Sequence, residues 1–195
     1  MSTVNLTDQQ LVKLLCEGDL KAIELIIKKY KNKVYTYIIV IVKSKDLAND
    51  IFQETFIKVF ENLRKKNYED RGTLLSWIIR IAHNLIIDYF RKEKRIPTLS
   101  KDTYDYDILN SRKYSEKSTE EEIVHKQVEK DIILLLDALP YEQKQIVMLR
   151  FFGDLSFKEI AELTDVSINT ALGRMRYALI NLRRLIDKNN IVLNA

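Results

Sequence analysis

The sequence predicts an all-α fold of two small helical domains joined by a flexible acidic linker, with a helix-turn-helix in the C-terminal domain. The 195 residues include only four Gly and two Pro, so few positions interrupt a helix. Apolar residues recur every three or four positions in both domains, whereas the linker has no apolar stripe. We expect domains at residues 1–97 and 125–195, with the linker at residues 98–124.

Composition narrows the class of protein. The chain is 46% apolar and 31% charged with a net charge of +4, which is typical of a water-exposed globular protein with a mild basic excess. Cys16 is the only cysteine, so an intrachain disulfide and a cysteine cluster for zinc are both excluded. The N-terminus has no signal-peptide pattern, and the apolar run at residues 34–42 is too short to span a bilayer. We therefore expect a cytoplasmic protein with no metal, no cofactor and no membrane insertion.

The first helices follow from capping and periodicity. Thr7 and Gln10 have the spacing of a capping box ahead of an apolar stripe, so a helix should begin near Thr7. The run VYTYIIVIV at residues 34–42 could form a strand on propensity alone. We interpret it as buried helix because the helical spacing of apolar residues continues upstream to Ile23.

The next helix, predicted at residues 46–63, has two contrasting faces. Its apolar residues from Leu47 to Leu63 recur at helical spacing, which places acidic and amide side chains together on the opposite face. These side chains are Asp50, Gln53, Glu54 and Glu61. Such a face either binds a basic partner or is only solvated, and this helix alone does not decide between them.

The helix predicted at residues 74–94 becomes more basic toward its C-terminal end. Its inward stripe is Ile78, Ile81, Ala82, Leu85 and Tyr89, and Trp77 is expected in the core. Its polar face is Arg80, His83, Asn84, Arg91, Lys92 and Arg95. Cations in the last turn complement the helix dipole, but Arg80 and Asn84 lie well upstream and suit phosphates and base edges. His125 is the only other histidine, which argues against a metal site at His83.

The linker and the helices after it differ in composition. Residues 99–122 hold seven acidic and four basic side chains, so the segment buries too little apolar surface to offset its ordering entropy. After it, one helix should end at Pro140 and another should span residues 141–152. Gly153 is the predicted left-handed cap of that second helix.

The C-terminal pattern predicts a helix-turn-helix. Ser156 and Glu159 form a capping box, residues 164–166 make the turn, and Ser167 caps the second helix. The residues expected to be buried in that helix are Ala171, Met175, Ala178, Leu179, Leu182 and Ile186. The residues expected on its exposed side are Asn169, Thr170, Arg174, Arg176, Tyr177, Arg183 and Arg184. These polar side chains suit the major groove of DNA, and the alternative is a plain helical hairpin with solvated arginines.

Taken in order, three motifs give the chain a resemblance to a known family. They are DLANDIFQETF at residues 46–56, SWIIRIAHNLIIDYFR at residues 76–91, and the segment from Leu139 to Arg184. Together they resemble a bacterial RNA polymerase sigma factor of the extracytoplasmic-function (ECF) type of the sigma-70 family. The first motif is similar to the helix that binds core polymerase, the second to the minus-ten recognition helix and the third to the minus-thirty-five domain.

The resemblance implies a role for each candidate site residue. Asp50, Gln53, Glu54 and Phe56 would contact the clamp helices of the largest subunit of RNA polymerase, while the flap would be a second contact. The minus-ten element would be bound by Arg71, Arg80, Asn84, Arg91, Lys92 and Arg95. The minus-thirty-five element would be bound by Ser167, Asn169, Thr170, Arg174, Arg176 and Tyr177. The acidic linker would thread the polymerase cleft, and an anti-sigma factor is a further partner that the family implies.

Some positions depart from the family pattern. Asp165 occupies a turn position that usually carries Gly, and Leu172, Gly173 and Tyr177 occupy positions that are usually basic or polar. The resemblance therefore carries no base preference for the minus-thirty-five element.

Two other classes of protein share parts of this pattern. A conventional helix-turn-helix transcription regulator would bind duplex DNA without binding core polymerase, and its acidic face would be dispensable. An enzyme would need a catalytic constellation, and the sequence has no phosphate-binding Gly loop, no metal cluster and no nucleophile with an adjacent base. The resemblance favours the sigma factor over both.

Overall fold

The computed structural model describes residues 6–65, 68, 73–93 and 132–189, and within these ranges every regular element is a helix. The helices are α1 (Asp8–Cys16), α2 (Lys21–Val42), α3 (Lys45–Arg64), α4 (Leu74–Lys92), a helical segment at residues 132–137, α6 (Tyr141–Phe151), α7 (Phe157–Leu163) and α8 (Ile168–Asn189). The predicted all-α class is confirmed. The predicted linker at residues 98–124 lies outside the described residues, as do Arg71 and Arg95.

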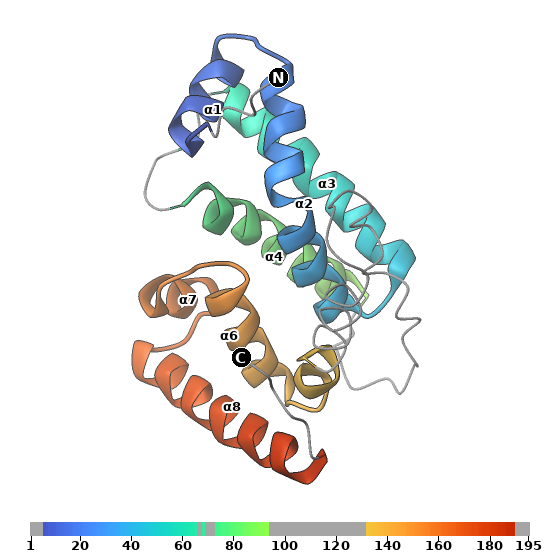
Figure 1. Ribbon diagram of the computed structural model, residues 1–195, viewed down its shortest axis with the longest axis vertical. Helices are drawn as coiled ribbons and strands as arrows, with labels where there is room; N and C mark the ends of the chain where they lie inside the picture. Colours follow the sequence, from blue (N-terminus) through green and yellow to red (C-terminus); the bar gives the residue numbers. More distant parts are fainter. Residues whose placement is uncertain (1–5, 66–67, 69–72, 94–131, 190–195) are drawn as a thin grey trace, which may run out of the picture.

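Residues 6–93 form the N-terminal half, in which α2, α3 and α4 pack on one another and α1 packs on α2 and α3 (Figure 1). Thr7 and Gln10 form the predicted capping box at the start of α1. The apolar run at residues 34–42 is helical, and its Tyr37 and Ile38 are fully buried. This run can be apolar all round because α2 is covered by α3, α4 and also α6.

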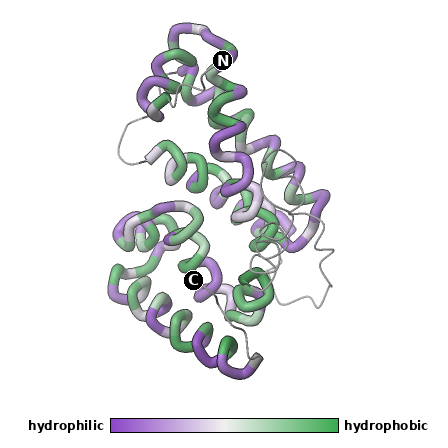
Figure 2. Tube along the Cα trace, viewed as in Figure 1, coloured by the Kyte–Doolittle hydropathy of each residue, from purple (hydrophilic) through white to green (hydrophobic). Residues whose placement is uncertain are grey.

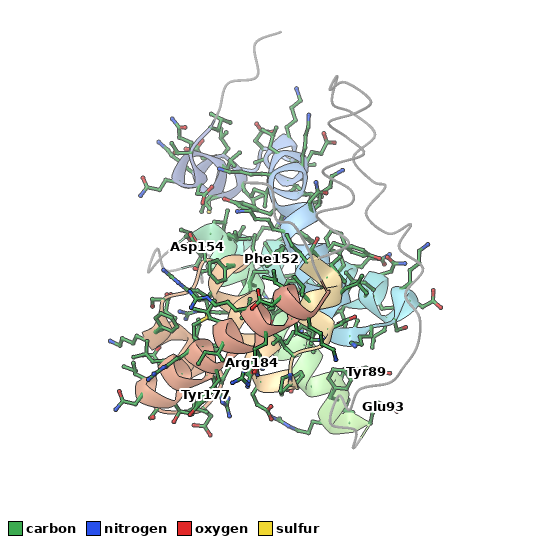
Figure 3. The ribbon with its side chains drawn as sticks, turned by 60° about the horizontal axis from the view of Figure 1, so that its bottom comes forward. Tyr89, Glu93, Phe152, Asp154, Tyr177 and Arg184 are labelled. Carbon is green, nitrogen blue, oxygen red and sulfur yellow. The ribbon has the colours of Figure 1, made fainter. Side chains whose placement is uncertain are left out.

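α4 is the central helix of the molecule, and hydrophobic residues run along most of it (Figure 2). Thr73 caps its first turn, and Leu74, Ile78, Ala82 and Ile86 are fully buried. The expectation that Tyr89 faces inward is wrong, because Tyr89 lies in the last turn of α4, where the core no longer covers it (Figure 3).

Residues 132–189 form the C-terminal half, in which α6 and α7 pack on α8. Ser156 and Glu159 form the predicted capping box of α7. The expectation that Leu179 is buried is wrong: Leu179 is exposed because its neighbour Ala178 faces the core.

The predicted left-handed cap at Gly153 is also wrong. The left-handed residue after α6 is Asp154, with φ of 57°, and Gly153 has an ordinary φ. Gly153 is required for space, because a Cβ there would lie 2.7 Å from the Leu149 carbonyl oxygen and 3.0 Å from Ile79 Cγ2. The absence of a side chain at Gly153 therefore allows the C-terminal half to lie close to α4.

The two halves pack against each other in the described residues. Their buried apolar side chains form one contiguous cluster, in which Ile79 of α4 and Met148 of α6 are both fully buried. α6 and α7 lie beside α4, while α8 lies on the far side of the C-terminal half (Figure 1). The polar face of α4 and that of α8 thus have different surroundings.

Candidate protein and nucleic-acid interfaces

The acidic face predicted on α3 is exposed. Asp50, Gln53, Glu54 and Glu61 all lie at the surface, and Ser44 caps the helix that carries them. Glu54 makes only a long ion pair of 3.7 Å with the half-exposed Lys58, one turn away. Such pairs contribute little to stability, so the carboxylates stay available to a basic partner.

Ile57 lies on the same face and was missed by the sequence analysis. It is 53% exposed and follows Asp50 and Glu54 at the spacing that keeps side chains on one side of a helix. Its exposure could have been predicted from the sequence, because Ile57 lies outside the apolar stripe of Ile51, Phe56 and Val59, all of which are buried. The face therefore combines carboxylates with an exposed apolar side chain.

Phe56, predicted to contact a partner, is buried with 4% of its surface exposed. Its ring packs 4.9 Å from that of Phe52 and 5.9 Å from that of Phe60, measured between centroids. The side chain belongs to the aromatic core that holds α3 in place and does not lie at the surface with Asp50.

On α4, Arg80 and Asn84 have different environments. Asn84 is exposed, as are Arg91 and Lys92, and Arg91 makes a long contact of 3.5 Å with Asp88. Arg80 is partly covered: its Nη2 donates to Oε1 of Glu159 in α7 at 2.6 Å. The Nε of Arg80 is buried and has no hydrogen-bond partner in the part of the chain that the structure describes.

His83 does not lie on the polar face of α4, which corrects the sequence analysis. It is 3% exposed, and its Nδ1 lies 2.8 Å from the Tyr37 hydroxyl. His83 is buried because it follows Ile79 by one turn, on the side of α4 that faces the core. Burial lowers the pKa of His83 to about 4, so its imidazole is neutral near pH 7.

The helix-turn-helix is formed as predicted, with α7 and α8 joined by a tight turn. Asp165 in that turn adopts a left-handed φ of 52°, which Asp tolerates better than most residues. The Ser167 hydroxyl accepts from the Thr170 amide at 3.0 Å, which is the geometry of a helix N-cap. Ser167, Asn169, Thr170, Arg176 and Tyr177 are exposed, and Arg174 is half-buried.

The register of α8 sorts these side chains further. Ala171, Met175 and Ala178 face the core, so the opposite face carries Asn169, Gly173 and Arg176. A Cβ at Gly173 would meet nothing within 4 Å, so the backbone there is open to close approach. Tyr177 and Arg184 continue the exposed side toward the C-terminal end (Figure 3).

Arg174 lies to one side of this face. Its flank of α8 also carries Asn181, whose amide donates to Gln143 of α6 at 2.8 Å. On the opposite flank, Ile168 and Leu172 are 46% and 44% exposed. The central exposed face is therefore polar and basic, with apolar side chains along one edge.

The described residues offer neither a metal site nor a membrane-spanning helix. Among them, no group of three or more His, Cys, Asp or Glu side chains is arranged to hold a metal ion. No helix in the described ranges is both long enough and apolar enough to cross a membrane.

Comparison with known proteins follows the same division of the chain. Residues 26–96 match Sigma-70 region 2, and residues 129–177 match Sigma-70 region 4. The chain is 31% identical to RNA polymerase sigma factor SigV of Bacillus subtilis over 165 residues, which cover 85% of this chain and 91% of the relative. The chain belongs to the sigma-70 family of RNA polymerase sigma factors.

The sigma factor also resembles proteins of the ECF type. It is 29% identical to the ECF RNA polymerase sigma-E factor of Haemophilus influenzae over 174 residues, covering 87% of this chain and 90% of that protein. The acidic face of α3 and the polar face of α4 fall within the region 2 match, and most of the exposed face of α8 falls within the region 4 match.

Solved structures share the fold of this sigma factor. The sigma factor RpoE from Bartonella quintana, crystallised with the anti-sigma factor NepR, matches with a TM-score of 0.59 and 17% identity, over 86% of this chain and 98% of that one. CnrH, solved with the cytosolic domain of CnrY, matches with a TM-score of 0.58 and 16% identity, over 93% and 97% of the two chains.

Proposed function

We propose that this sigma factor binds core RNA polymerase through the exposed acidic face of α3 and recognises promoter DNA through α4 and α8. Membership of the sigma-70 family gives the role, which is promoter-specific initiation of transcription, and sigma factors are not enzymes. The observation that supports the assignment of surfaces is that each matched region carries its own exposed polar face. We assign the sigma factor to the cytoplasm, where its polymerase acts, and to domains at residues 1–97 and 125–195 with a linker at residues 98–124.

The polymerase contact rests on chemistry that suits a basic helical partner. Asp50, Gln53 and Glu54 supply carboxylates and an amide, and Ile57, on the same face, supplies an apolar anchor. Complementary charge speeds encounter and fixes register, while an exposed apolar side chain that becomes buried on binding adds affinity. We assign this face to the clamp helices of the largest subunit, and the C-terminal half to the flap.

The minus-ten contact is assigned to the polar face of α4. Arg80, Asn84, Arg91 and Lys92 supply cations for phosphates and an amide for a base edge, and Arg71 and Arg95 belong to the same assignment. Capture of an unstacked base costs a few kcal/mol, which these contacts must offset. The strand of the opened promoter is the expected ligand, and the acidic linker would occupy the polymerase cleft.

The minus-thirty-five contact is assigned to the exposed side of α8. Asn169 and Arg176 lie opposite the core on the first turns, where a recognition helix meets base edges, and Tyr177 extends this side. Ser167, Thr170 and Arg174 lie at the N-cap and on the flank, where phosphate contacts are expected. Gly173 lets the helix backbone approach the groove closely.

Transcription in vitro tests the function as a whole. Purified core polymerase and the chain, incubated with a library of promoter fragments, should start RNA synthesis at defined sites and give the promoter consensus. A conventional regulator, the alternative class, would bind duplex DNA without polymerase and start no synthesis. That result would reject the proposal.

The double substitution Asp50→Arg with Glu54→Arg tests the polymerase contact. It should reduce affinity for core polymerase by more than about a hundredfold, because like charges placed opposite each other cost several kcal/mol. Affinity is measured by pull-down and by titration of labelled chain. The matched control is Glu17→Arg with Glu24→Arg, two exposed acids outside the acidic face of α3 that receive the same charge change. Equal affinity of both variants would contradict the assignment.

A further inference from the structure

We propose that Asp8 of α1 is a positioning residue for the minus-ten contact: its carboxylate holds the first turn of α4, and through that turn it sets where Arg80 and Asn84 meet the DNA strand. The inference rests on the proposed function of α4. It adds a role in promoter recognition for α1, which carries none of the side chains assigned to DNA or to polymerase.

The carboxylate of Asp8 connects three helices of the N-terminal half. Its Oδ1 accepts from the Tyr30 hydroxyl and, at 2.7 Å, from Lys29 Nζ, both on α2. The backbone amide of Leu74, the first residue of α4, also donates to it. Burial alone would raise the pKa of Asp8, but these hydrogen bonds outweigh it and lower the pKa, so the group is ionised near pH 7.

An anion at this place fixes the start of α4. The first N–H groups of a helix have no partner within the helix, and together they carry a partial positive charge. The Thr73 hydroxyl accepts from the Ser76 amide at 3.1 Å, and Asp8 accepts from the Leu74 amide. α4 is therefore capped twice, once by its own N-cap residue and once by a carboxylate from α1.

Aromatic side chains connect this cap to the segment between α3 and α4. Tyr68 in that segment packs edge-on against Trp77 of α4, with ring centroids 5.0 Å apart. Burial, the Asp8 carboxylate and Tyr68 together raise the pKa of Tyr30, so the Tyr30 hydroxyl stays protonated and donates to Asp8 near pH 7. Asp8, Tyr30, Tyr68 and Trp77 thus form one connected cluster at the start of α4, which we call the Asp8 cluster.

Trp77 also shares a face of α4 with the side chains assigned to the minus-ten strand. Arg80 follows Trp77 by three positions and Asn84 follows Arg80 by four, so the three side chains lie on one side of the helix. A shift or rotation of the first turns of α4 would therefore move this side. A surface that is fixed before binding loses less entropy when it binds, so Asp8 favours strand binding without touching DNA.

The fluorescence of Trp77, the only tryptophan of the chain, tests the positioning directly. Asp8→Asn keeps the size of the side chain and an acceptor oxygen but removes the charge. We expect the Trp77 emission of this variant to shift to longer wavelength and to be quenched more strongly by acrylamide, because the Asp8 cluster loosens. Circular dichroism and thermal melts establish that the variant is folded at the temperature of the measurement.

Strand binding is measured with the full-length chain in the absence of polymerase. The probe is a fluorescein-labelled single-stranded DNA of about 12 nucleotides, selected from a random pool by binding to the natural chain and followed by anisotropy. Asp8→Asn removes a negative charge, so electrostatics alone would tighten binding. Loss of positioning should instead weaken binding of the selected strand about three- to tenfold, and weaken binding of the unselected pool less.

Two further variants sharpen the test. Glu17→Gln is the matched control, because it removes an exposed acid at the end of α1 that makes only a long pair of 3.9 Å with Lys13, and it should change neither signal. Tyr30→Phe removes only the hydroxyl that donates to Asp8, and it should change both signals in the same direction as Asp8→Asn but by less.

The possible outcomes separate this inference from the proposed function. Unchanged Trp77 fluorescence in Asp8→Asn would overturn the positioning of α4, and a changed fluorescence with unchanged strand preference would overturn its role in DNA binding. If the natural chain selects no strand over the random pool, the assignment of α4 to the minus-ten element is itself rejected. A selected strand that Asp8→Asn and Glu17→Gln bind equally well rejects only the role of Asp8.

Discussion

α4 and α8 each combine a buried apolar stripe with a polar face that carries arginines, but the two polar faces meet different surroundings. On α4, Arg80 is held by Glu159 of the other half and is only partly exposed. On α8, Asn169 and Arg176 lie opposite the core and are exposed. Two helices with similar sequence patterns therefore differ in how accessible their polar faces are, and the difference comes from what packs against each of them.

The buried sides of α4 and α8 should differ most in how they make the stability of the protein depend on pH. α4 buries His83 with a lowered pKa of about 4, whereas the buried stripe of α8 has no titratable side chain. The unfolded chain binds a proton on this histidine below about pH 6.5, but the folded chain does not. Stability should therefore fall as pH falls from about 6.5 to about 4, by up to about 3 kcal/mol.

Denaturant titration at a series of pH values measures this effect. His83→Gln, which can still hydrogen-bond Tyr37, should flatten the profile over that range. Asp8 and Glu159 contribute to the pH dependence of stability over a lower pH range than His83 does. The pKa of each is lowered, because hydrogen bonds outweigh burial, so their contributions are lost only below their ordinary carboxyl values. An unchanged slope in the His83 variant would assign the acid sensitivity elsewhere.

The next largest expected effect is on the affinity for promoter duplex when arginines on the exposed side of α8 are replaced. Arg176→Ala should weaken binding to the selected promoter duplex by about 1–3 kcal/mol and weaken binding to a scrambled duplex much less. Arg174→Ala, on the half-buried flank, should weaken both equally by less than about 1 kcal/mol, as expected for a phosphate contact. Anisotropy with the two duplexes at several salt concentrations measures both losses. If Arg174→Ala instead weakens binding to the promoter duplex more than binding to the scrambled duplex, Arg174 contacts the bases.

The parts of the molecule that depend on neighbours in the chain are predictable from the sequence. The capping boxes at Thr7 and Ser156, the helix at residues 34–42 and the helix-turn-helix are all confirmed, because spacing and local hydrogen bonds determine them. The exposed acids of α3 also lie on the predicted face. Periodicity is enough to sort side chains between inside and outside on a helix that packs along its whole length.

The predictions that are wrong concern residues whose environment depends on segments distant in the sequence. His83 is polar by type, but the hydroxyl of Tyr37 from α2 satisfies it inside the core. Tyr89 continues the stripe of α4 past the end of the described core and is exposed. Gly153 is needed for its close approach to Ile79 and not for a left-handed turn. The pairing of Arg80 with Glu159, 79 positions apart, has no local signal at all.

The smallest effect concerns the turn before α8. Asp165 is left-handed, so Asp165→Gly relieves a modest strain but loosens the unfolded chain. The two terms oppose each other, and the free energy of unfolding should change by less than about 1 kcal/mol. Thermal melts of the variant measure it. A larger loss would mean that the carboxylate of Asp165 has a structural role of its own.

The close approach at Gly153 has an evolutionary consequence. A Cβ there would lie 2.7 Å from the Leu149 carbonyl oxygen in its own half and 3.0 Å from Ile79 Cγ2 in the other half, so a side chain at this position requires both neighbours to shift while the halves remain in contact. A bulkier residue at 153 becomes tolerable only with local rearrangement and a smaller partner at 79. Residues 153 and 79 should therefore change together wherever the two halves stay in contact, whereas a Cβ at Gly173 would meet nothing within 4 Å and is not restricted by the fold.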